Sequence, residues 1–282
     1  MIAITGASGQ LGRLVADELA RRGLARQVTL GTRDPAKLAP TMHADFRIVA
    51  ANFDQPETLE LLFSGSETAL LICGNAPNDV RIRQHRAAIA AAKKSGVRRL
   101  VYTSFVNPHE TSLFPFAKVH AATEADMLAS GLACTFLRSN QYFENLNAAL
   151  GMAQQTGVLT LPGASGKVAY LGRADIAAAT AAVLAEPQQF ADHYELTGSE
   201  ALDLFDIAVR ASTSWGRDVS AKEMAVDHYH KILESRRLPT YAIEAQIGIR
   251  LAAAAGEQAG TTHDVARLIG RTPKTMEEFL RR

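Results

Sequence analysis

The chain of 282 residues carries 30 Lys and Arg against 29 Asp and Glu, so its formal net charge is +1. This balance argues against a polybasic nucleic-acid binder, and 47% hydrophobic with 21% charged residues is typical of a folded globular chain. Two cysteines cannot form a disulfide framework, which favours a reducing, cytoplasmic location. The N-terminus lacks the pattern of a secretory signal. No apolar run reaches the ~18–20 residues of a membrane helix, so we expect no membrane contact.

The first predicted element is a strand at residues 2–5. Gly6, Gly9 and Gly12 follow at G-x-x-G-x-x-G spacing, and then an amphipathic helix that ends near Gly23. Strand, glycine turn and helix are the context in which this spacing predicts a dinucleotide site. The glycines permit a tight turn and close approach to a pyrophosphate, and the helix N-terminus offers unpaired N–H groups. The alternative is a glycine-rich turn in another kind of α/β protein.

The second predicted strand, residues 27–31, is followed by Arg33 and Lys37 instead of the acidic residue of an NAD site. Arg at this point accommodates a 2′-phosphate, and Lys37 can add a second positive charge. Asp34 precedes Pro35 and is expected to cap the next helix. The sequence therefore favours NADP(H) over NAD(H), although Lys37 has the alternative of a solvated surface lysine.

Further strands are predicted at residues 46–49, 68–73, 99–104 and 134–138, with helices around 59–63, 83–95 and 118–130. This alternation predicts an α/β fold with a Rossmann-type, doubly wound parallel sheet. The carboxyl ends of such strands share one edge, where ligands bind. That edge is expected to collect residues 6–12, Arg33, Cys73, Gly74, Asn75, Ser104 and Asn140.

Beyond Asn140 the pattern loosens. Residues 157–166 are rich in turn formers, Arg173 opens an Ala-rich helix, and residues 193–196 are typical of a late strand. Helices are predicted at 204–215, 222–235 and 240–255. We therefore expect an NADP-binding Rossmann domain at residues 1–140. A smaller, mainly helical substrate lobe is expected at residues 141–282, interleaved with late strands of the sheet.

Catalytic candidates lie near the predicted helix at residues 118–130. The orthodox dehydrogenase site has a Tyr four residues before a Lys, whose charge lowers the phenol pKa, and no Tyr-x-x-x-Lys occurs in this chain. Lys118 and His120 stand in the equivalent region, about 200° apart on an ideal helix, so both cannot face one pocket. His120 could serve as a general acid or donate a hydrogen bond to an oxyanion. A surface lysine and a histidine without a role are the alternatives.

Other reactive residues give weaker signals. The eight histidines are scattered without metal-ligand spacing, so no metal site is predicted. Cys73 and Cys134 are expected to be buried core thiols. The pairs Arg98-Arg99 and Arg236-Arg237 are expected to be solvated.

Several stretches of the sequence resemble the NmrA-like atypical short-chain dehydrogenases, and within them the bacterial type 2 NAD(P)H:quinone oxidoreductases. They are residues 1–12, Arg33 with residues 35–37, residues 84–86, 102–104, His120 with residues 123–124, and 135–140. Residues 173–175, 194–196 and 268–271 also resemble this family. The likeness covers essentially the whole chain. Its most specific part runs from Tyr102 to Asn140, because the glycine motif belongs to the whole superfamily.

The resemblance implies NADPH, no flavin, and a substrate cleft between a Rossmann domain and a smaller C-terminal domain. It also implies roles for individual residues. Gly6, Ala7, Ser8, Gly9, Gln10 and Leu11 would wrap the pyrophosphate, with Arg33 at the 2′-phosphate. Asn52 and Phe53 would flank the adenine, Cys73 and Gly74 would line the nicotinamide side, and Tyr142, Phe143, Glu144 and Asn145 would border the substrate cleft. A Lys occupies the position of His120 in the isoflavone-reductase branch, so this chain departs from a lysine-dependent mechanism.

Two functions are compatible with these features. The first is an NADPH-dependent reductase that passes hydride directly to a quinone or a similar flat, electron-poor acceptor, for which orientation supplies most of the catalysis. Similar relatives reduce triphenylmethane or azo dyes. The second is a non-catalytic NADP(H) sensor, because the likeness includes transcriptional co-regulators. The oligomeric state stays open, with a homodimer among the alternatives.

Overall fold

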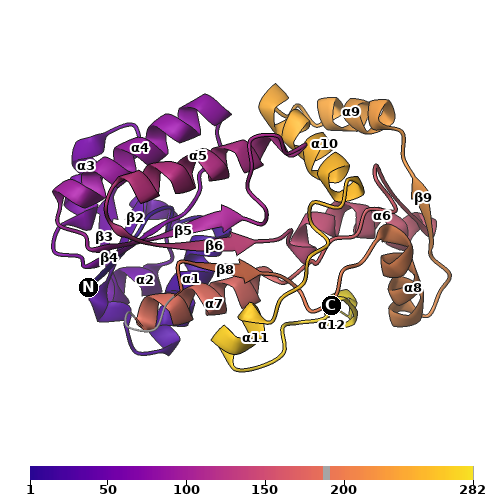
Figure 1. The fold of residues 1–282 in the computed structure, drawn as a ribbon. Coiled ribbons are helices and arrows are strands. Elements are labelled where there is room, and N and C mark those ends of the chain that lie inside the picture. The colour runs from indigo at the N-terminus through magenta and orange to yellow at the C-terminus, as the bar shows by residue number, and fades with distance from the viewer. Residues whose placement is uncertain (187–190, 282) are drawn as a thin grey trace. The chain divides into compact units, whose positions relative to one another are not determined.

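The computed structural model describes residues 1–186 and 191–281, in which seven strands form one sheet in the order β3-β2-β1-β4-β5-β6-β8 (Figure 1). The strands are β1 (Ile2–Ile4), β2 (Val28–Thr32), β3 (Arg47–Ala50), β4 (Thr68–Leu71), β5 (Arg99–Phe105), β6 (Ala133–Ser139) and β8 (His193–Leu196). Neighbouring strands from β3 to β5 are parallel. Because β1 pairs with both β2 and β4, the strand order reverses beside β1, where doubly wound sheets bind ligands. The predicted Rossmann-type sheet is confirmed.

The chain divides into two compact units that alternate along the sequence. Unit 1 comprises Met1–Phe105, Val119–Arg138 and Ile176–Tyr194, and unit 2 comprises Val106–Lys118, Ser139–Asp175 and Glu195–Arg282. The predicted boundary at residue 140 stays a prediction.

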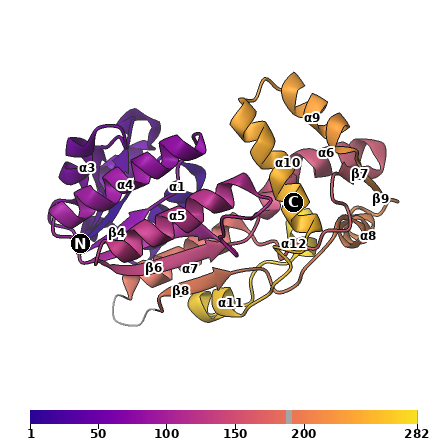
Figure 2. The same ribbon diagram turned by 45° about the horizontal axis from the view of Figure 1, so that its top comes forward.

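Unit 1 is a sheet covered by helices on both faces. Its helices are α1 (Gln10–Arg21), α2 (Pro40–Asp45), α3 (Pro56–Phe63), α4 (Asn78–Lys94), most of α5 (Pro115–Ala129) and most of α7 (Arg173–Ala185), with short 3₁₀ turns at Ala25–Gln27 and Pro35–Lys37. Figures 1 and 2 show α3, α4 and α5 on one face of the sheet and α7 on the other. Strands β1, β2 and β4 are buried at every position, as expected of parallel strands covered on both faces.

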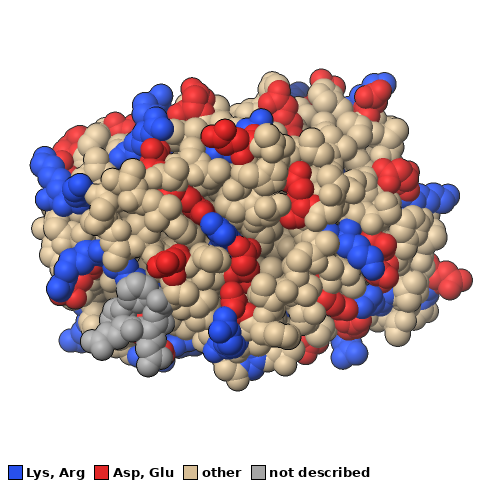
Figure 3. All heavy atoms as spheres, viewed as in Figure 1, with Lys and Arg blue, Asp and Glu red and all other residues tan. Residues whose placement is uncertain are grey.

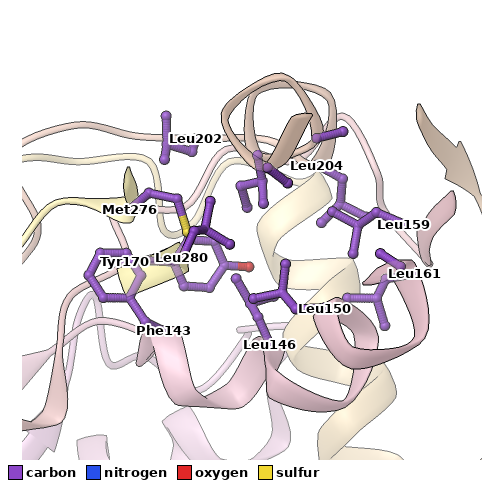
Figure 4. Packing of buried hydrophobic residues seen from close by; sticks show 14 of the residues in the cluster. Phe143, Leu146, Leu150, Leu159, Leu161, Tyr170, Leu202, Leu204, Met276 and Leu280 are labelled. Carbon is purple, nitrogen blue, oxygen red and sulfur yellow. The ribbon is translucent and has the colours of Figure 1, made fainter. Parts of the chain in front are cut away.

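Unit 2 is mainly helical. It contains a 3₁₀ turn (Phe143–Leu146), α6 (Asn147–Thr156), α8 (Leu204–Trp215), α9 (Val226–Ser235), α10 (Thr240–Ala254), α11 (Asp264–Ile269), α12 (Met276–Leu280) and the two-stranded parallel sheet of β7 (Val158–Leu161) and β9 (Ser220–Glu223). Its core gathers apolar side chains from distant segments (Figure 4).

Three sequence predictions were wrong in detail. The helix predicted at 222–235 begins at Val226, and the residues before it form β9. The turn-rich region 157–166 contains β7, which pairs with β9 some sixty residues away and so gives no local signal. Arg99 is buried, not solvated: its guanidinium donates to the Val183 carbonyl at 3.0 Å and the Thr135 hydroxyl at 3.4 Å.

The surface carries both signs of charge. Figure 3 shows Lys and Arg interspersed with Asp and Glu over one face, in keeping with the net charge of +1. Within residues 1–186 and 191–281, no helix combines the length and the hydropathy of a membrane span. Among the same residues, no three His, Cys, Asp or Glu side chains come close enough together to ligate a metal.

Candidate nucleotide-binding site

A cavity of about 290 Å³ opens at the carboxyl ends of β1, β2 and β4, entirely within unit 1. Its position is the switch point of the sheet, where the strand order reverses. The residues that line it are Gly6, Ser8, Gly9, Thr32, Arg33, Ala51, Asn52, Phe53, Ile72, Cys73, Gly74, Asn75, Ala76 and Gln84.

The turn between β1 and α1 lines this cavity with Gly6, Ser8 and Gly9. Gly6 has a φ of +63°, which side chains rarely tolerate, and Gly9 is the N-cap of α1 without any side-chain cap. The first N–H groups of a helix have no intrahelical partner, and together with the helix dipole they attract an anion. The Ser8 hydroxyl accepts a hydrogen bond from Thr32 at 2.7 Å, which leaves its own proton for donation to a ligand.

Two glycines near the cavity differ in what a side chain at their positions would meet. A Cβ on Gly12 would lie 2.4 Å from the Gly6 carbonyl oxygen and 2.8 Å from the Ala7 Cα, so Gly12 allows α1 to pack against the turn. Gly74 differs, because the nearest atom to its Cβ would be Gln84 Oε1 at 4.0 Å. The protein's own packing therefore does not require glycine at position 74, and the free space belongs to the cavity.

The end of β2 supplies positive charge at the cavity. Arg33 lines it with an exposed side chain, whereas Lys37 is exposed, lies outside the lining, and has its ammonium 3.9 Å from Asp34. Asp34 caps the short helical turn that follows, as predicted, by accepting from the Ala36 N–H at 3.1 Å.

The loop after β3 forms another wall with Ala51, Asn52 and Phe53. Asn52 holds the loop, because its Oδ1 accepts from the Asp54 N–H at 3.1 Å. Gln84 reaches from α4 to donate to both carboxylate oxygens of Asp54 at 3.1 Å.

The wall after β4 is held by side chains where the sheet ladder stops. Thr5 accepts from the Ile72 N–H, and Thr103 accepts from the Cys73 N–H, each at 2.9 Å. The buried Arg81 guanidinium, on α4, donates to the Gly74 carbonyl at 3.2 Å and to Cys73 Sγ at 3.4 Å. Cys73 is half-buried: it packs against the core of unit 1, as predicted, and it also lines the cavity.

A buried polar cluster lies behind this wall. The Tyr102 hydroxyl is 2.9 Å from Nδ1 of His120, and Tyr102 packs edge-on against His85. Burial, with Arg81 and His85 nearby, holds the pKa of His120 well below its ordinary value. Burial, with Arg81 again, lowers the pKa of His85 to about 3, and burial raises the pKa of the Tyr102 phenol. Both histidines and the phenol are therefore neutral at pH 7.

Most predicted cofactor residues meet at the cavity, but some do not line it. Ala7, Gln10, Leu11 and Gly12 belong to the turn and the start of α1 without being part of the lining. Ser104 is buried and donates to Glu124 at 2.6 Å. Asn140 is buried in unit 2, where it donates to the Gln258 carbonyl at 2.8 Å and accepts from the Gln141 N–H. Both polar groups thus serve the protein's own hydrogen bonding.

The predicted catalytic and substrate residues also differ in their surroundings. Lys118 is exposed near the start of α5, and His120 is 7% exposed. Tyr142 is half-buried beneath the Arg173 guanidinium, 5.1 Å from its ring centre. Phe143 is 2% exposed, lies in the core of unit 2 (Figure 4) and stacks on Phe279, and its place at a substrate cleft stays a prediction.

Sequence reasoning missed five lining residues: Thr32, Ala51, Ile72, Ala76 and Gln84. The first four each adjoin a predicted residue. Thr32, Ala51 and Ile72 also stand at the ends of β2, β3 and β4, so the register of the parallel sheet could have identified these three. Gln84 comes from the second turn of α4, and only the fold reveals that it reaches the cavity.

These residues fit a phosphorylated dinucleotide. The uncapped N-terminus of α1 and the glycine turn suit a pyrophosphate, Arg33 suits a second phosphate, and Gly74 leaves room for close approach of a ligand.

Comparison with known proteins decides the family, because the model of the NmrA-like family matches residues 1–280. The chain belongs to the NmrA-like family. It is 32% identical to quinone oxidoreductase 2 of Escherichia coli over 278 residues, which are 99% of this chain and 96% of that protein. The E. coli NADPH-dependent quinone oxidoreductase in complex with NADPH has a TM-score of 0.92, over 99% of this chain and 98% of that one.

Two dye reductases are also similar to this chain. The structure of Citrobacter sp. triphenylmethane reductase complexed with NADP(H) has a TM-score of 0.90 at 29% identity, covering 99% of each chain. An NAD(P)H azoreductase of Xenophilus azovorans is 24% identical over 279 residues, which are 99% of this chain and 96% of that protein. The predicted family and fold are confirmed.

Proposed function

We propose that this NmrA-like protein is an NADPH-dependent reductase that passes hydride to a quinone or another flat, electron-poor acceptor. The observation that carries the proposal is the cavity that joins the uncapped N-terminus of α1 to Arg33 at the switch point of the sheet. The full-length similarity to quinone and dye reductases supports the class of NAD(P)H-dependent oxidoreductase.

We assign the cofactor contacts by element. Residues 6–11 bind the pyrophosphate, Arg33 the 2′-phosphate, Asn52 and Phe53 the adenine, and residues 73–75 the nicotinamide side. Arg33 favours NADPH over NADH, because a guanidinium pairs with a phosphate through two parallel hydrogen bonds. When bound, NADPH supplies a hydride and leaves as NADP⁺.

A quinone makes small demands on the protein beyond orientation. Hydride addition leaves a negative charge on the carbonyl oxygen. The ring delocalises this charge, and the oxygen then takes a proton. The chain can therefore act without Tyr-x-x-x-Lys. His120 is the candidate for stabilising that oxygen as a neutral hydrogen-bond donor, because its buried ring does not carry the extra proton of a general acid near pH 7. Lys118 stays a predicted catalytic residue. If it has no catalytic role, Lys118→Met should leave turnover unchanged.

The test is the loss of NADPH absorbance with purified protein and a panel of benzoquinones, naphthoquinones, an azo dye and a triphenylmethane dye. We expect saturable turnover with a quinone, and a lower KM for NADPH than for NADH. Binding of NADPH at micromolar or tighter Kd without turnover of any acceptor would refute the reductase and favour an NADP(H) sensor. The variant Arg33→Ser should weaken the binding of NADPH and leave the binding of NADH unchanged, so it tests the role of Arg33 at the 2′-phosphate.

A further inference from the structure

The Tyr102–His120 pair has a defined direction of hydrogen bonding. We propose that the Tyr102 hydroxyl donates to Nδ1 of His120 and thereby fixes the proton of this histidine on Nε2, so that His120 acts as a neutral hydrogen-bond donor. Tyr102 is then a positioning residue for the acceptor's oxygen. The functional half of this inference rests on the reductase proposed above, whereas the proton positions can be measured without any activity.

The direction follows from what the Tyr102 hydroxyl can bond. Tyr102 is fully buried, and its proton needs an acceptor. The hydroxyl is hydrogen-bonded to His120 Nδ1 at 2.9 Å, and the Cys73 thiol and the Thr123 hydroxyl also lie near it. Sulfur is a weak acceptor, and the Cys73 sulfur already accepts from Arg81. The imidazole nitrogen is therefore the strongest acceptor within reach.

Thr123 fixes the opposite proton position on the other buried histidine. Its hydroxyl donates to the Val119 carbonyl at 2.7 Å, so it must accept from Nδ1 of His85 at 2.8 Å. His85 consequently carries its proton on Nδ1, and its buried Nε2 has no hydrogen-bond partner. The two histidines beside Tyr102 thus hold their protons on opposite ring nitrogens.

The surroundings of His120 keep the ring oriented and uncharged. Phe105 lies on the imidazole with ring centres 6.2 Å apart and planes 25° apart. The titratable groups that face the ring are Tyr102 from β5 and Arg81 and His85 from α4. A cation beside a buried imidazole opposes its protonation, so an imidazolium does not form here near pH 7. A neutral imidazole can still polarise a carbonyl oxygen through its N–H.

The first test is nitrogen NMR on protein labelled with ¹⁵N-histidine, in which His120→Gln and His85→Gln assign the two ring systems. We expect a protonated Nε2 on His120 and a protonated Nδ1 on His85, unchanged between about pH 6 and 8. A proton on Nδ1 of His120, or titration of His120 within that range, would overturn the inference.

The second test uses Tyr102→Phe, which removes the donor and keeps the ring. We expect the His120 signals to shift toward a mixture of the two proton positions, while those of His85 stay as they are and report an intact cluster. With a quinone, kcat should fall roughly 10-fold with an unchanged Kd for NADPH, less than the ~10²–10³-fold typical of losing an oxyanion donor outright. Tyr170→Phe, a buried tyrosine of unit 2 bonded to Arg250, is the matched control and should leave kcat and the His120 spectrum unchanged.

The outcomes separate the inference from the proposed function. An inactive protein with the expected spectra would refute the reductase and leave the positioning by Tyr102 confirmed. An active enzyme in which Tyr102→Phe changes neither the His120 spectrum nor kcat would refute the positioning role. If Tyr102→Phe does not fold, the wild-type spectrum alone decides the proton positions.

Discussion

The same substitution at two helical glycines should change stability in opposite directions. Gly12 lies in α1 and Gly151 in α6, and neither has a positive φ. A Cβ on Gly12 would meet the Gly6 oxygen at 2.4 Å and the Ala7 Cα at 2.8 Å, whereas a Cβ on Gly151 would meet nothing within 4 Å. Both variants gain the helix propensity of alanine over glycine, about 1 kcal/mol.

The clash decides the sign for Gly12→Ala. Overpacking typically costs about 1–3 kcal/mol, and contacts this short with backbone atoms belong at the upper end, because backbone cannot rotate away as a side chain can. Subtracting the gain of about 1 kcal/mol leaves a net loss of about 2 kcal/mol, or about 4–8 °C in Tm. Gly151→Ala should instead gain about 0.5–1 kcal/mol, a rise in Tm of about 2 °C.

Thermal and urea unfolding of the two variants, together with NADPH binding by fluorescence, measure these effects. Because the Gly6 carbonyl and Ala7 belong to the turn at the cavity, Gly12→Ala should also raise the Kd for NADPH, whereas Gly151→Ala should leave it unchanged. A Gly12→Ala protein as stable as the wild type, with unaltered affinity, would refute the assignment of this glycine to close helix–turn packing.

Three further outcomes can be measured. Arg33→Ser should weaken NADPH binding about 10–100-fold, the loss of charge-assisted hydrogen bonds, without changing the affinity for NADH, as titration of each cofactor would show. Iodoacetamide at pH 8 should label Cys73 in the cavity wall, and bound NADPH should protect Cys73 from labelling. Cys134 should stay unlabelled, because burial raises the pKa of its thiol to about 11. Mass spectrometry distinguishes labelling at the two sites. The free energy of unfolding should reach its full value above about pH 6.5 and fall below that pH by about 1.4 kcal/mol per pH unit for each of His85 and His120. The reason is that these two histidines bind protons in the unfolded chain but stay neutral in the folded one. Urea midpoints that stay constant from pH 7 to 5 would contradict this last expectation.

The sequence was sufficient to predict the Rossmann half of the fold because its signals are local. Residues 1–12 contain a short apolar strand, the glycines and the start of a helix within twelve consecutive positions, and each neighbouring strand has its own apolar run. Arg33 was found for the same reason, as the residue one past β2. Such patterns depend on neighbours in sequence, which a single sequence contains in full.

The features that were missed depend on contacts between distant segments. The family resemblance placed Phe143 at the substrate cleft, and nothing in the sequence indicated that its ring stacks on Phe279, 136 residues later, in the core of unit 2. Strand β9 has three exposed residues of four and thus no apolar alternation to announce it. Arg81 and Gln84 both lie on α4. Only the packing of this helix against the sheet shows that Arg81 donates to the Gly74 carbonyl and that Gln84 donates to Asp54.

The buried cluster links the stability of unit 1 to its chemistry. Burial of His85 leaves its Nε2 without a partner, which costs about 1–3 kcal/mol, and burial of both histidines makes the fold sensitive to acid. An apolar core at these positions would be more stable and indifferent to pH. The cluster therefore has to be explained by something other than stability. The hydrogen bond between Tyr102 and His120 proposed above would give the His120 ring one orientation with its proton on one nitrogen, and an apolar core would not.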